Sequence, residues 1–187
     1  MTRRRYTFDP PDRFVAGTVG QPGDRTFFLQ ARDGVRVVSI VLEKVQVSVL
    51  AERLAELLAE LERRGVPAAA AGPAGVVDDV APLDEPLNEA FRAGSLTLGW
   101  DGEAERVLLE ARAQSEDGEP IDPDEDDDDD EDGPDLLRVL MTPAVARTFV
   151  ARAARVVAAG RPPCPLCGNP LDPQGHICPR RNGHYVN

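Results

Sequence analysis

The period of apolar and polar residues changes several times along the chain, and each change predicts a structural element. Short runs rich in β-branched and aromatic residues predict β-strands. These runs are residues 13–19, 25–32 and 35–42 in the first half, and residues 91–98, 106–113 and 135–141 in the second half. Turn signals separate neighbouring runs, as at Asp33-Gly34 and at Trp100-Asp101-Gly102, so we expect hairpins in both halves.

Two segments follow the 3.6-residue period of an amphipathic helix. The first extends for about twenty residues from Glu43, and Gly65 stands where a helix would stop. Its apolar positions are Val45, Val49, Ala51, Leu54, Leu57, Leu58 and Leu61. The second helix covers residues 144–159, with Thr142 and Pro143 suited to the N-cap and the first helical position.

The two halves of the chain resemble each other. Phe14-Val15-Ala16-Gly17 matches Phe91-Arg92-Ala93-Gly94, and the later strand-to-helix segments align without gaps at an offset of 99 residues. Each half therefore reads as three strands followed by a helix. Two such units can form one core because each covers the apolar face of the other.

Composition divides the chain into four parts. Residues 1–65 are the first repeat and residues 91–160 the second. Between them, residues 66–90 contain four prolines and an alanine run, which predicts a linker or a loop over the surface. Inside the second repeat, residues 116–134 predict a disordered acidic loop. Residues 161–187 form a separate tail.

The formal net charge of −12 comes from this one insert. Fourteen of the 33 acidic residues lie between Glu116 and Asp135, a stretch without Lys or Arg. The rest of the chain contains 19 acidic and 21 basic residues and is therefore close to neutral. Net charge therefore does not exclude anionic partners.

Several classes of protein are disfavoured by the sequence. No run of 18 apolar residues predicts a membrane span, and the N-terminus lacks the apolar region of a secretory signal. Three cysteines do not make a disulfide framework. We therefore expect a cytoplasmic protein without membrane contact.

The strongest chemical signal lies in the tail, where all three cysteines and both histidines occur within 21 residues. Cys164-Pro165-Leu166-Cys167-Gly168 has the spacing of a zinc knuckle, and Cys178 supplies a third thiolate. The fourth ligand is His176 or His184. The compact His-x-Cys spacing favours His176. No open coordination position or general base is evident, so we expect a structural rather than a catalytic Zn²⁺.

Arginines suggest two other kinds of function. Arg25 and Arg106 occupy matching positions in the two repeats and are candidates for binding an anion between them. An enzyme acting on a phosphorylated small molecule is therefore an alternative. From Arg147 to His184 there are six arginines and one acid, so nucleic-acid binding through the basic tail is a third reading.

Two blocks carry a resemblance to a known family. Residues 12–20 with residues 23–31, and the tail from Arg161 to Cys178, resemble an uncharacterised actinobacterial family built on a domain of unknown function. The resemblance extends over essentially the whole chain. It implies no established activity, and it implies His176 rather than His184 as the zinc ligand.

Together these patterns predict an α+β protein with two β-β-β-helix repeats sharing one core, followed by a small C-terminal zinc knuckle. The function that they favour is non-enzymatic, a binding or adaptor protein with a structural zinc and an unidentified protein partner. No catalytic residue is predicted.

Overall fold

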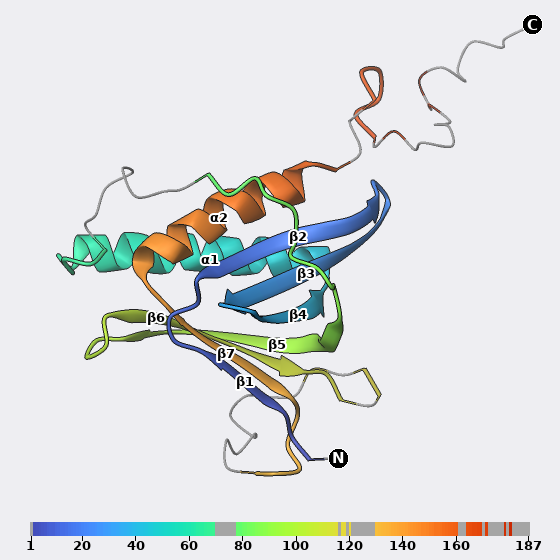
Figure 1. The fold of residues 1–187 in the computed structure, drawn as a ribbon. Coiled ribbons are helices and arrows are strands. Elements are labelled where there is room, and N and C mark those ends of the chain that lie inside the picture. The colour runs from blue at the N-terminus through green and yellow to red at the C-terminus, as the bar shows by residue number, and fades with distance from the viewer. Residues whose placement is uncertain are drawn as a thin grey trace, which may run out of the picture.

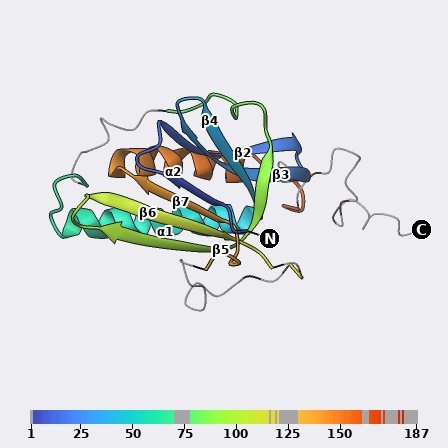
Figure 2. The same cartoon turned by 60° about the horizontal axis from the view of Figure 1, so that its bottom comes forward.

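Seven strands and two helices make up the regular structure of the described residues, and the two helices lie side by side on the same face of the sheet (Figures 1 and 2). The computed structural model describes residues 2–69, 78–115, 117–118, 120, 130–160, 164–169, 171, 178 and 180. The fold is mixed α+β, as the sequence predicts. Neither helix is both long enough and apolar enough to cross a lipid bilayer.

The predicted elements are all present, with ends shifted by a few residues. The strands are β1 (Arg5–Phe8), β2 (Arg13–Gln21), β3 (Asp24–Asp33), β4 (Arg36–Leu42), β5 (Glu89–Asp101), β6 (Arg106–Ala113) and β7 (Leu136–Met141). The helices are α1 (Lys44–Arg63) and α2 (Pro143–Ala158). The sequence did not predict β1, a strand of four residues that is too short to show a period.

All seven strands belong to one sheet in the order β1-β7-β6-β5-β4-β3-β2. Strands β2, β3 and β4 form an antiparallel meander that leads into α1, and β5, β6 and β7 form another that leads into α2. The meanders join through a parallel β4–β5 pair, and β1 pairs in parallel with β7 at the far edge. The same order of elements, three antiparallel strands followed by a helix, therefore occurs twice along the chain, and all six of these strands belong to one sheet.

Both helices begin and end where their sequences provide caps. At the start of α1, the Glu43 side chain and the Gln46 side chain each accept a hydrogen bond from the other residue's backbone, and Gly65 follows its end with φ of 73°. At α2, the Thr142 hydroxyl accepts a 3.3 Å hydrogen bond from the Val145 N–H, and Pro143 is the first helical residue. These caps explain why the helix limits were predictable.

The buried face of α1 differs in part from the predicted apolar stripe. Ala51, Leu54, Leu58 and Leu61 are buried as that stripe implies, together with Val47 and Leu50. By contrast, Val45 and Val49 are 65% and 46% exposed. Because the first turn of α1 contains several valines on different sides of the helix, sequence alone does not show which of them faces the sheet.

One apolar core extends beneath both meanders. Alternate residues of the strands face the helices, and the Phe14 ring from β2 stacks on Phe149 from α2 at a centroid distance of 4.8 Å. Leu29, Leu54 and Leu109 are fully buried in the same cluster. Burial of each such side chain contributes about 1.5–3 kcal/mol to folding. Neither half could keep its apolar residues from water without the other.

Residues 78–88 contain no helix or strand, yet they are bound to the body of the protein. We call them the crossing segment, because they run across β2 (Figure 1). The Leu83 side chain fills the space above Gly17, where a Cβ atom would lie 2.6 Å from Leu83. The Gln30 amide donates to the Asp84 carbonyl at 3.0 Å and accepts from its N–H at 2.8 Å. This part of the predicted linker is therefore an anchored surface loop.

Candidate metal centre

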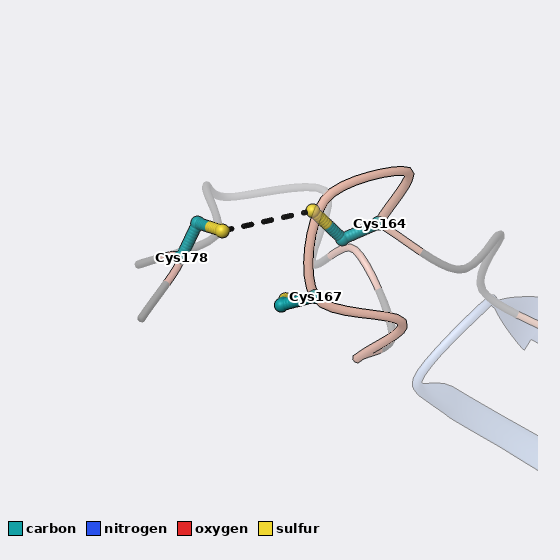
Figure 3. Close-up of side chains that lie close together, drawn as sticks. All are labelled: Cys164, Cys167 and Cys178. Carbon is teal, nitrogen blue, oxygen red and sulfur yellow. Dashed lines mark hydrogen bonds between the residues drawn. The ribbon is translucent and has the colours of Figure 1, made fainter. Parts of the chain in front are cut away.

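Three cysteine thiols gather at the C-terminal end of the described chain. The sulfur atoms of Cys164, Cys167 and Cys178 all lie within 4.8 Å of one another, and those of Cys164 and Cys178 are 3.9 Å apart. In Figure 3 these two sulfurs point toward one another, with Cys167 beside them. The structure thus brings together the three thiols that the sequence predicted as ligands.

A tight turn positions two of these thiols. The Cys164 N–H donates to the Asn169 carbonyl at 2.7 Å, and the Gly168 N–H donates to the Cys164 carbonyl at 2.8 Å. Gly168 has φ of 77°, a value that suits glycine better than any other residue. The Cys-x-x-Cys-Gly spacing therefore closes a loop with both sulfurs on its inner side.

Backbone N–H groups of this turn also set the charge on the sulfur atoms. The N–H groups of Cys167 and Leu166 donate toward the Cys164 sulfur and lower the pKa of that thiol to about 6. The Asn169 N–H acts in the same direction on Cys167. There, however, desolvation and the neighbouring sulfurs outweigh it and raise the pKa of Cys167. Of these two thiols, Cys164 therefore more readily becomes a thiolate, the form that binds metals.

The separation of the Cys164 and Cys178 sulfurs matches a metal site better than a disulfide. Tetrahedral zinc with Zn–S bonds of about 2.3 Å places its sulfur ligands about 3.8 Å apart, close to the observed 3.9 Å. A disulfide needs sulfurs about 2.05 Å apart, and all three cysteines are free thiols. Cys164 and Cys178 are buried, which keeps bulk water from most of their surface. The cluster can hold a metal ion. The two candidates for a fourth ligand, His176 and His184, lie outside the described residues.

The two arginines predicted to bind an anion have different surroundings. Arg25 lines a cavity of about 510 Å³ between the β2–β3 turn, the start of α1 and the end of α2. Arg106 does not line this cavity. Its guanidinium donates to the carbonyls of Ala104 and Glu105 and lies 4.0 Å from Asp9. Arg106 is therefore not part of the cavity that Arg25 lines.

A partly buried ionic cluster, which no sequence pattern predicted, joins the crossing segment to the body. The Asp79 carboxylate accepts two hydrogen bonds from Arg13 of β2, at 2.7 and 2.8 Å, and one from Arg152 of α2, at 2.6 Å. Arg152 also donates to the carbonyls of Ala16, Asp79 and Ala81. The Arg13 guanidinium lowers the pKa of Asp79. Only an arginine at a buried helix position hinted at this cluster in the sequence.

The N-terminal arginines contact the end of the acidic insert. Arg4 forms an ion pair with Asp135 at 2.6 Å, and the Arg3 N–H donates to the Glu131 carbonyl at 2.7 Å. Arg5 donates to the Asp130 carbonyl at 3.2 Å. These contacts hold β1 against the strand that follows the insert, so the N-terminal arginines are engaged within the molecule.

The fold and the cysteine cluster define an α+β protein with a potential metal site in its C-terminal tail. The family of proteins of unknown function called DUF3090 matches residues 6–178, and the chain belongs to this family. The match extends from β1 to Cys178, so the body and all three thiols are parts of the same family unit. Comparison with curated proteins and with solved structures found no match.

Proposed function

We propose that this protein binds a structural Zn²⁺ through its C-terminal cysteines and acts as a non-enzymatic binding or adaptor protein. The observation that carries the metal assignment is the convergence of three thiol sulfurs within 4.8 Å. Three thiolates favour zinc among the divalent ions that proteins commonly bind, because magnesium and calcium prefer oxygen ligands.

The structural role follows from the ligand count. Cys164, Cys167 and Cys178 with one imidazole would complete a tetrahedron and leave no position for water or substrate. His176 is the favoured fourth ligand, and His184 is the alternative. A tail of 27 residues is too short to bury a core of its own, so a metal supplies the stabilisation that apolar packing cannot.

Among the described residues, the two carboxylates with shifted pKa values are ion-pair partners and are not candidates for a general acid or base. Hydrogen bonds from Arg13 lower the pKa of Asp79, and those from Arg64 lower the pKa of Glu60. A general acid or base works best with a pKa near neutrality, and lowering moves a carboxylate away from that range. These groups act as fixed charges in ion pairs.

The metal assignment is tested by measuring zinc in purified full-length protein and its variants. We expect about one equivalent in the wild type and at least a fivefold loss in Cys164→Ser and in Cys178→Ser. His176→Ala and His184→Ala form a matched pair of variants. With His176 as the fourth ligand, His176→Ala should lose zinc and His184→Ala should keep it. Less than half an equivalent in the wild type, or full zinc in Cys164→Ser, would overturn the proposal.

The arrangement of the body is proposed to reflect duplication of a β-β-β-helix unit, in residues 1–65 and again in residues 91–160. Its support is the repeated element order, with β4 and β5 parallel where the units meet. Partner recognition by this body, in the cytoplasm and without membrane contact, completes the proposal. It is tested by capturing proteins with the full chain and with a variant lacking residues 161–187. An identical set of specific partners would exclude a role for the tail.

A further inference from the structure

A second site lies on the body, in the cavity of about 510 Å³ that Arg25 lines. Its walls come from three separate elements: the β2–β3 hairpin, the first turn of α1 and the end of α2. The lining residues are Gly23, Arg25, Phe27, Lys44, Val157, Ala158 and Gly160. This volume is within the range of about 300–1,000 Å³ that is usual for small-ligand pockets.

Two cations converge on this cavity. A Cβ atom on Gly160 would lie 3.7 Å from the Lys44 Nζ and 4.0 Å from an Arg25 Nη, so both groups reach the same small region. Lys44 is the only lysine of the chain. The Arg25 guanidinium lies over the Phe27 ring, 5.8 Å from its centroid, which gives it a preferred orientation.

Neither cation has a carboxylate partner among the described residues. This is unusual in a protein with 33 acidic residues, where most other described arginines form an ion pair. Lys44 and Arg25 also donate no hydrogen bond to a carbonyl in the described part of the chain, although the end of α2 is close. Two like charges close together and without an acid favour an anion between them.

We propose that Arg25 and Lys44 bind the phosphate group of a small phosphorylated ligand in this cavity. Arginine offers a planar fork of donors to phosphate oxygens and lysine adds a compact charge, a combination suited to a tetrahedral dianion. The Phe27 and Val157 side chains form an apolar wall beside the cations. The non-phosphate part of the ligand therefore contacts apolar surface. This site is independent of the zinc proposal, since none of its residues is a cysteine or a tail histidine.

Titration of the zinc-loaded full chain with inorganic phosphate and with phenyl phosphate, at constant ionic strength, tests the site. We expect both to bind, phenyl phosphate at least threefold more tightly because of the apolar wall. Arg25→Gln and Lys44→Gln should each weaken binding at least fivefold. Arg63→Gln removes one charge from the exposed far end of α1 and should bind like the wild type.

Gly160→Asp separates loss of the site from loss of the fold. Its carboxylate would lie between the two cations and take the place of the anion, so phosphate binding should disappear while the melting temperature stays the same or rises. Equal affinity of Lys44→Gln, Arg25→Gln and Arg63→Gln would overturn the proposal. So would benzoate binding as tightly as phenyl phosphate, because the site would then not select phosphate, or no binding of either phosphate by the wild type.

Discussion

Asp79 links the crossing segment to both a strand and a helix of the body. Its carboxylate receives hydrogen bonds from a strand and from a helix, while its own segment crosses β2. Its side chain is 15% exposed, and those of Arg13 and Arg152 are 10% and 8% exposed. Breaking a buried ion pair from one side leaves an uncompensated charge, which costs more than the pair contributes when intact. Asp79 is therefore where a single change should weaken the crossing segment most.

Asp79→Asn should lower the free energy of unfolding at pH 7 by about 2–3 kcal/mol, because it removes the carboxylate that pairs with the nearly buried Arg152 guanidinium, whereas Arg13 keeps its ion pair with Asp84 at 2.7 Å. Asp78→Asn is the matched control. Asp78 is 68% exposed and pairs only at the surface with Arg155, so its loss should cost less than about 1 kcal/mol. Urea unfolding followed by circular dichroism measures both. Equal effects would show that the Asp79 cluster adds nothing beyond a surface pair.

The same carboxylate gives a pH dependence of known sign. The folded pKa of Asp79 lies below the value in the unfolded chain, which is about 3.9. The stabilisation is therefore complete above that value and is lost as the pH falls through the folded pKa. The difference in unfolding free energy between the wild type and Asp79→Asn should be constant from pH 7 to about 5 and narrow below about pH 4. A difference that widens in acid would contradict this assignment.

At the scale of elements, the sequence pattern predicted those features that depend on interactions between residues close together in the chain. The strands and helices follow from apolar period, and the helix ends follow from Thr142, Pro143 and Gly65, whose effects act within a turn. The Cys-x-x-Cys turn was predictable for the same reason. The Asp79 cluster and the Arg25–Lys44 cavity bring together residues that are far apart in the sequence. Neither the apolar period nor the spacing of motifs predicts such long-range contacts. The sequence left a linker and a surface loop as alternatives for the crossing segment, because the contacts that anchor it are with residues far away in the sequence.

Gly17 provides a test of how the crossing segment packs on β2. A Cβ atom there would lie 2.6–2.9 Å from three side-chain carbons of Leu83, so any side chain must displace the Leu83 side chain from its place on β2. Gly17→Val should destabilise the protein by about 1–3 kcal/mol. Gly99→Ala is a suitable control in β5, because its Cβ would meet only the Leu108 Cβ, at 3.9 Å. Thermal unfolding of the two variants distinguishes them. If Gly17→Val were as stable as Gly99→Ala, Leu83 would not be packed against β2.

At the scale of the whole molecule, the net charge of −12 conceals an internal arrangement of charges. The end of the acidic insert binds the N-terminal arginines at one edge of the sheet, whereas Arg25 and Lys44 lie with the end of α2. The phosphate-bearing ligand that we propose would therefore meet two cations that have no carboxylate partner in the described part of this acidic protein. Added salt should weaken the binding of this ligand only moderately, because Arg25 and Lys44 are the two charges of the protein that contact its phosphate group.

We expect the body and the cysteine cluster to be separate stabilising units. Within the described part of the chain, the core residues run from Phe8 to Ala153, so the metal should stabilise only its own surroundings. Chelating the metal from the full-length protein should shift the melting temperature of the body by less than about 2 °C. The tail should become more sensitive to protease, and added zinc should reverse the change. A body that unfolds as the metal leaves would show that the tail is part of the cooperative core, because two independent units cannot lose their structure together.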